Sequence, residues 1–189
     1  PEKLLCVVRI QENGKMADII WGCVDGGRPT SELASHLMSH SVRLKADPNH
    51  RVVLHCHATN LVAMSHAHSL DENEFTRRIW QMCTECLYVF PDGIGILPWL
   101  VPGTNEIGLQ TAEKMKSCRL VLWPQHGIFG TGVDLDDAFS LVEVAEKAAE
   151  VYMLQAAVGD SKKQYISDKD LLDFAKVFGV KPKDGILKV

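Results

Sequence analysis

The sequence has few aromatic residues, no long apolar run and no extended tract of charge of one sign. Aromatic side chains make up 7% and charged side chains 23% of the 189 residues, and the formal net charge is -4. No stretch approaches the length of an apolar membrane span, and the mild negative charge argues against a general nucleic-acid surface. We therefore expect a globular protein with no membrane and no nucleic-acid partner.

The six cysteines do not form the dense framework of a small secreted protein. They lie inside apolar segments, so we interpret them as mostly reduced and buried. The first residues show no signal-peptide pattern, and together these features predict a cytoplasmic protein. Because Pro1-Glu2-Lys3 leads at once into an apolar segment without an initiator methionine, we expect the chain to begin inside a larger domain.

Apolar periodicity predicts strands and helices that alternate along the chain. The pair Asn13-Gly14 is a hairpin signal between two strands, and Thr104 and Ser167 are candidate N-caps of helices. We expect strands over 4–10, 16–24, 51–57, 86–90 and 119–124, an extended segment over 94–103, and a turn followed by a strand over 126–132. Helices are expected over 29–45, 58–70, 73–85, 105–117, 134–158 and 167–178. Gly159 is expected to end the long helix. With no repeat or linker, the pattern predicts one layered α/β or α+β domain over residues 1–189.

The segment RVVLHCHATN places two histidines at the end of an apolar strand. Side chains two residues apart on a strand project from the same face, so His55 and His57 are neighbours while Cys56 points into the opposite layer. Two imidazoles on one rigid strand can bind one side of a divalent metal, and catalytic zinc takes three protein ligands and leaves one position open. The pair therefore predicts part of a metal site.

His126 is the best candidate for a third ligand. It follows the apolar strand RLVLWP and precedes Gly127, which permits a tight turn. We favour a metal over separate core histidines, because two buried imidazoles would otherwise need separate hydrogen-bond partners. A role of His55 and His57 as hydrogen-bonded core residues stays open, and His126 taken alone is more typical of a turn residue.

A second metal site on one helix is an open alternative. Glu32, His36 and His40 recur at intervals of four on a predicted helix face. They lack the His-Glu-X-X-His arrangement of a metalloprotease, so we favour surface or packing roles for the two histidines. His66 and His68 diverge on a helix and are assigned no role.

Two glutamates and a cysteine pair lie at junctions between predicted elements. Glu32, in the first turn of a helix after a glycine-rich break, suits either an N-terminal cap or an active-site loop. Glu85 lies between a helix and a strand, where a solvated carboxylate is the more common role. Cys83 and Cys86 form a single Cys-X-X-Cys, which we interpret as structural because it ends a predicted helix rather than opening one.

Four stretches of the sequence resemble the class II zinc-dependent aldolase and epimerase family. They are PTSELASHLMSH, HCHATNL, TECLYVFPDGIGILPWLVPGTNEIG and LVLWPQHGIFGTG. They span most of the chain in the family's order, and HCHATN with FPDGIGILPW is most similar to its rhamnulose branch. The resemblance implies a central, mainly antiparallel β-sheet between helical layers, an α/β fold that assembles as a homotetramer.

The resemblance also implies an activity and a role for each candidate residue. It implies that His55, His57 and His126 bind catalytic Zn²⁺. Glu32 is implied to transfer protons beside the metal, and Glu85 to reach into a neighbouring subunit's site as a second acid–base group. The implied reaction is that of a lyase of rhamnose metabolism, which cleaves the phosphorylated ketose L-rhamnulose 1-phosphate to dihydroxyacetone phosphate and L-lactaldehyde.

The family's glycine-rich, phosphate-binding loops belong to an amino-terminal segment that has no counterpart in these 189 residues. The resemblance therefore implies that the chain is the carboxy-terminal two thirds of a class II aldolase domain, and whether it is active alone stays open. Two other functions stay open too. One is a related sugar-phosphate aldolase, epimerase or dehydratase with the same metal, and the other is a non-catalytic zinc-binding fragment.

Overall fold

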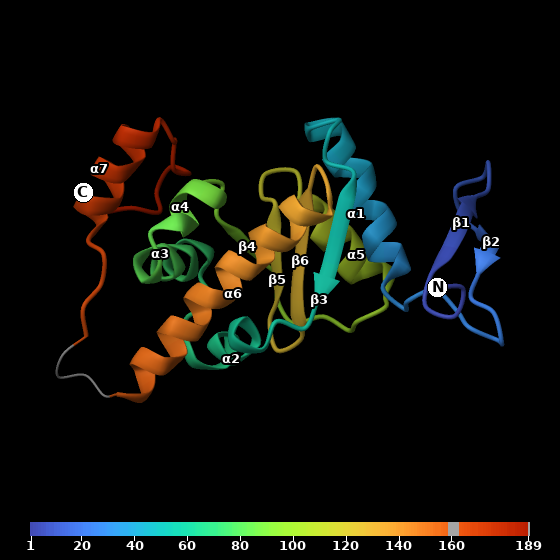
Figure 1. Ribbon diagram of the computed structural model, residues 1–189, viewed down its shortest axis with the longest axis horizontal. Helices are drawn as coiled ribbons and strands as arrows, with labels where there is room; N and C mark the ends of the chain where they lie inside the picture. Colours follow the sequence, from blue (N-terminus) through green and yellow to red (C-terminus); the bar gives the residue numbers. More distant parts are fainter. Residues whose placement is uncertain (159–162, 189) are drawn as a thin grey trace. The chain divides into compact units, whose positions relative to one another are not determined.

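The computed structural model describes residues 1–158 and 163–188 (Figure 1). The chain divides into two compact units, Pro1–Leu33 and Ala34–Val189. A compact unit is not by itself an independently folding domain, so one domain over residues 1–189 stays a prediction. The expected helix end at Gly159 lies outside the described residues.

The first unit contains a two-stranded antiparallel hairpin. Strands β1 (Cys6–Ile10) and β2 (Ala17–Gly22) pair with each other. Gly14 lies in the connection with a φ of 66°, a left-handed conformation that glycine adopts without strain. The side chain of Asn13 accepts a hydrogen bond from the backbone N–H of Lys15 (2.8 Å), so the hairpin predicted from Asn13-Gly14 is confirmed.

The second unit is built on a four-stranded sheet with the order β3-β6-β5-β4. The β3–β6 and β6–β5 pairs are antiparallel, and only β5–β4 is parallel. The strands are β3 (Val52–Cys56), β4 (Ile94–Ile96), β5 (Leu120–Trp123) and β6 (Gly127–Gly132). The expectation of a mainly antiparallel central sheet is therefore confirmed.

Seven helices lie in the described residues. They are α1 (Leu33–Ala46), α2 (Thr59–Ala67), α3 (Glu72–Met82), α4 (Glu85–Val89), α5 (Asn105–Lys114), α6 (Leu135–Ala157) and α7 (Asp168–Phe178). The side chains of Thr104 and Ser167 accept hydrogen bonds from backbone N–H groups in the first turns of α5 and α7, as predicted. None of these helices has both the length and the apolar character needed to cross a membrane.

The sheet lies between two helical layers, and alternate strand residues face each layer. Leu120 and Leu122 pack in the larger core cluster with residues of α2, α3 and α6, and Figure 1 shows α6 crossing this face of the sheet. Val121 and Trp123 belong to the second cluster, which includes side chains from α1 and α5. This alternation is the two-residue period of a strand buried on both faces, so the predicted layered α/β fold is confirmed.

The prediction of a strand over 86–90 is wrong, because this segment forms helix α4. Its residues suit a strand by local preference, but β4 occupies the place beside β5 at the edge of the sheet. Cys86 and Leu87 are fully buried in the larger core cluster, and α4 packs against α6 and α7. Tertiary packing therefore overrides the local preference.

Candidate metal centre

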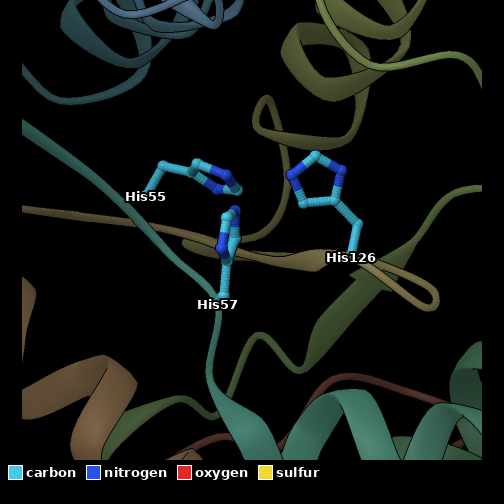
Figure 2. A group of neighbouring side chains, drawn as sticks. All are labelled: His55, His57 and His126. Atoms are coloured by element: carbon cyan, nitrogen blue, oxygen red, sulfur yellow. The ribbon is translucent and has the colours of Figure 1, made fainter.

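Three histidines come together in the second unit. One ring nitrogen from each of His55, His57 and His126 lies within 4.8 Å of those of the other two. The ring centroids are separated by 5.3 Å for His55–His57, 5.3 Å for His55–His126 and 4.9 Å for His57–His126. Figure 2 shows the three rings turned toward a common centre. The structure thus brings together all three residues that the sequence nominated as metal ligands.

Strand pairing explains how residues so far apart in the sequence meet. His55 pairs with Phe129 and Cys56 with Ile128 across the β3–β6 ladder, so the end of β3 lies beside the beginning of β6. Trp123 pairs with Gly127 across the β5–β6 turn. The backbone N–H of His126 donates to the carbonyl of Trp123 (3.0 Å), which closes the turn and sets His126 next to the end of β3.

His55 has one ring nitrogen occupied and one without a partner. Its Nδ1 lies 3.1 Å from the backbone oxygen of Ile128, so in the neutral ring Nδ1–H donates to this carbonyl. Its Nε2 is buried and makes no hydrogen bond. Burial lowers the pKa of His55 to about 4, which keeps the ring neutral at pH 7. A buried nitrogen lone pair without a donor is what a metal ion would satisfy.

Aromatic side chains form one wall of the site. The ring of His55 stacks on Phe129 with centroids 4.4 Å apart, and Trp123 lies 5.2 Å from both His55 and His126. The indole N–H of Trp123 donates to the hydroxyl of Thr111 on α5 (2.9 Å), which fixes the orientation of the indole. These contacts restrict the imidazole rotamers before any ligand binds.

Gly127 is required by the close approach of the two ligand-bearing segments. A Cβ atom at this position would lie 2.5 Å from the carbonyl oxygen of Cys56 and 3.1 Å from ring carbons of both His55 and His57. A side chain would therefore push β6 away from the end of β3. The glycine that the sequence suggested for a tight turn also leaves room for the histidine rings.

The donor set fits a divalent metal with an open coordination position. Among residues 1–158 and 163–188, the three histidines are the single group of this kind, and it has no fourth cysteine or carboxylate member. Three protein ligands are typical of catalytic zinc, whereas structural sites are closed by four. His36 and His40 belong to no such group in the described part of the chain. His36 instead packs on Phe129 with centroids 5.0 Å apart.

Glu32 lies in the first unit, one residue before α1 begins. Its backbone N–H donates to the hydroxyl of Thr30 (3.2 Å), and the hydroxyl of Ser31 donates to its carboxylate (3.4 Å). Glu32 is thus in the turn that precedes the helix rather than in the first helical turn. Its assignment to proton transfer stays a prediction.

Glu85 is the first residue of α4 and is exposed. It is not a member of the histidine group. The thiol of Cys83 donates a hydrogen bond to its carboxylate (3.0 Å), and this bond lowers the pKa of Glu85. Cys83 directly follows α3, and Cys86 lies in the first turn of α4. The prediction that the Cys-X-X-Cys motif ends a helix rather than opening one is therefore wrong, because the motif does both. All six thiols are free.

A hollow of about 100 Å³ borders His126. Its lining is mostly apolar and includes Trp99, Ile107 and Trp123. The hollow therefore offers a small apolar space beside one of the three histidines.

Sequence reasoning missed the polar contacts that support the turn before β6. The backbone N–H of Gln125 donates to the hydroxyl of Ser65 in α2 (2.9 Å), and its side-chain amide donates to the Ser65 carbonyl (3.0 Å). Nothing in the local pattern around Ser65 links it to a residue sixty positions later. The segment WPQHG signals a turn, but not the partner that holds it.

Comparison with known proteins places these features in a family. The model of the family described as class II aldolase and adducin N-terminal domain matches residues 2–153. A rhamnulose-1-phosphate aldolase of Enterococcus faecalis is 61% identical over 97% of this chain and 66% of its own length. A rhamnulose-1-phosphate aldolase of Listeria monocytogenes is 56% identical over 99% of this chain and 68% of its own length. The chain thus spans about two thirds of the length of these curated relatives.

The fold is also found in solved structures. A sugar-phosphate aldolase from Thermotoga maritima superposes with a TM-score of 0.67 at 33% identity, covering 77% of this chain and 61% of that protein. The family match extends over both ligand-bearing segments, from the His-X-His at the end of β3 to the turn before β6. On its sequence and its fold, the chain belongs to the family of class II aldolases and adducin N-terminal domains.

Proposed function

We propose that this chain catalyses the zinc-dependent cleavage of L-rhamnulose 1-phosphate to dihydroxyacetone phosphate and L-lactaldehyde. The observation on which the proposal rests is the group of three histidines, one of which, His55, has a buried Nε2 without a hydrogen-bond partner. Membership of the aldolase family and the names of relatives that are 61% and 56% identical support the reaction and the sugar. The absence of a fourth ligand from the group in the described residues favours a catalytic over a structural metal.

His55, His57 and His126 would hold the zinc ion. A neutral imidazole is the form that binds zinc, and the Ile128 carbonyl fixes the tautomer of His55 with Nε2 available. Bound zinc supplies a Lewis acid that stabilises the negative charge developing on the ketose oxygens as the C3–C4 bond breaks.

The two glutamates move the protons of the reaction. Cleavage removes the proton of the C4 hydroxyl, which becomes the aldehyde oxygen, and delivers a proton to C3 of the dihydroxyacetone phosphate half. In the proposal, Glu85 takes the first proton and Glu32 delivers the second. General acid–base groups of this kind contribute rate factors of about 10² to 10⁴.

The proposed assembly is a cytoplasmic homotetramer in which Glu85 serves a neighbouring subunit's site. The exposure of Glu85 at the start of α4 and its separation from the histidine group support this arrangement. Light scattering of the zinc-loaded protein tests it. A mass of four chains is expected, and a monomer that cleaves the sugar at full rate would contradict a role for Glu85 in another subunit.

The reaction is tested by incubating zinc-loaded protein with L-rhamnulose 1-phosphate and measuring dihydroxyacetone phosphate with a coupled reductase. Triose phosphate formation that stops when zinc is removed by a chelator is the expected result. An epimerised sugar phosphate without triose phosphate would replace the aldolase with a related enzyme. Zinc binding without turnover of any sugar phosphate would favour the non-catalytic fragment.

A further inference from the structure

The turn that carries His126 contains a left-handed residue that is not glycine. Gln125 has a φ of 60°, a conformation that is strained for a residue with a side chain. Such a conformation persists when the surrounding structure holds it. The side chain of Gln125 is exposed, so core packing does not supply the restraint.

Ser65 in the last turn of α2 supplies this restraint through two hydrogen bonds. Its hydroxyl accepts from the backbone N–H of Gln125 (2.9 Å), and its carbonyl accepts from the Gln125 side-chain amide (3.0 Å). The hydroxyl in turn donates to the carbonyl of Val62 (2.6 Å). Ser65 is buried, with 3% of its surface exposed, so its hydroxyl has one defined donor and one defined acceptor. This arrangement fixes the backbone one residue before His126.

Helix α2 links the two segments that bear the histidines. It begins at Thr59, two residues after His57, and Ser65 lies in its last turn. Its first turn has no side-chain cap of its own. The carboxylate of Glu146 on α6 accepts hydrogen bonds from the backbone N–H groups of Asn60 (2.8 Å) and Leu61 (2.9 Å) instead. One helix anchored to α6 thus sets the distance between the His57 segment and the His126 turn.

We infer that Ser65 and Gln125 are positioning residues for His126. We also infer that α2 holds His57 and His126 at the spacing that a metal ion needs. The inference rests on the proposed metal centre and deepens it. Neither residue supplies one of the three imidazoles. Their effect is to place the third imidazole before the ion binds, so that binding does not have to order the turn.

The test compares three variants with the unmodified chain. Ser65→Ala removes the hydroxyl that holds the turn. Gln125→Asn keeps a residue that tolerates the left-handed backbone but shortens the side chain, so that the bond to the Ser65 carbonyl is lost. Ser39→Ala is the matched control, because Ser39 is a fully buried helical serine whose hydroxyl makes no hydrogen bond.

The measurements are the zinc dissociation constant by chelator competition, the visible spectrum of the cobalt-substituted protein, and the melting temperature of the metal-free protein. Ser65→Ala is expected to weaken zinc binding about tenfold or more, the range seen when an outer partner of a ligand is removed, and to alter the cobalt bands. Gln125→Asn is expected to weaken zinc binding less, in the same direction. Ser39→Ala is expected to change neither zinc affinity nor spectrum.

The outcomes that would overturn the inference can be told apart. Unchanged zinc affinity and an unchanged cobalt spectrum in Ser65→Ala would remove the positioning role while leaving the metal centre in place. Failure of the unmodified chain to bind zinc would contradict the proposed metal centre and, with it, the positioning role of α2. If Ser65→Ala does not fold, Gln125→Asn decides alone, since its side chain is exposed, and wild-type zinc affinity and cobalt bands in that variant would also overturn the inference.

Discussion

The Nδ1 atom of His55 and the backbone oxygen of Ile128 lie 3.1 Å apart across the β3–β6 pair. This contact assigns the ring proton to Nδ1 and leaves the buried Nε2 without a partner. The sheet ladder that holds the two strands together therefore also selects the histidine tautomer that a metal requires. The fold and the site therefore depend on the same pair of strands.

Replacing His57 by alanine is expected to remove most of the bound zinc. Two imidazoles would remain, and zinc sites with protein ligands use three or four. Metal analysis of the purified protein should give about one zinc per chain before the change and a small fraction of that afterwards. His66→Ala is the control, since His66 is exposed on α2 and outside the group. Equal zinc content in the His57 variant and the unmodified chain would count against the site.

Gly127→Ala is expected to reduce both stability and zinc binding. The added Cβ would lie 2.5 Å from the Cys56 carbonyl, so β6 must move away from β3. Overpacking of this kind costs about 1 to 3 kcal/mol of unfolding free energy, which urea unfolding measures. Zinc affinity should fall in parallel, because the same contact brings His55 and His57 next to His126. A variant with native stability and native zinc affinity would contradict the close approach.

Glu32→Gln is expected to keep the zinc and to lose at least about 100-fold in turnover. The amide has nearly the shape of the carboxylate but cannot exchange a proton, and the loss corresponds to the lower range for general acid–base catalysis. Glu12→Gln is the control, because it makes the same exchange at an exposed glutamate of the first unit. Turnover measured at equal zinc occupancy separates the proton-transfer role from metal binding. Unchanged turnover would take Glu32 out of the mechanism.

Asp168 is expected to make stability depend on pH in the acid range. Burial raises the pKa of its carboxyl group, but hydrogen bonds from Arg77, Gln81 and the backbone N–H of Lys188 outweigh burial and lower the pKa below 3.8. A pKa lowered in the folded state contributes stability that is present above the unfolded pKa. That stability is lost as the pH falls through the folded pKa.

The variant Asp168→Asn tests this pH dependence, because it leaves Arg77 without its carboxylate partner. We expect a loss of about 1 to 3 kcal/mol at pH 7, typical of the loss of hydrogen bonds to a charged group, and a weaker pH dependence below pH 4. Asp173→Asn on the same helix is the control, because Asp173 forms an exposed ion pair with Lys169 and should change little. Urea unfolding at pH 7 and pH 3 measures both variants, and identical pH dependence in Asp168→Asn and the unmodified chain would contradict the expectation.

Local patterns predicted most elements because they depend on short-range physics. The hairpin at Asn13-Gly14 and the caps Thr104 and Ser167 follow from backbone conformations and hydrogen bonds within a few residues. The strand over 86–90 was wrong because its outcome depends on distant partners. Residues with strand preference form α4 there, since β4 holds the sheet edge and α6 offers a core for Cys86 and Leu87.

By itself, the sequence determined the three imidazoles, the strands that end or begin beside them and the glycine that follows His126, because residue type and a two-residue period are local properties. The tertiary structure decided that His126 meets the other two, that Ile128 selects the tautomer of His55, and that Ser65 holds the turn at Gln125. These relationships join residues sixty or more positions apart. They arise only when the sheet and α2 pack together, because a hydrogen bond or a shared metal needs atoms a few ångströms apart, which no local pattern specifies.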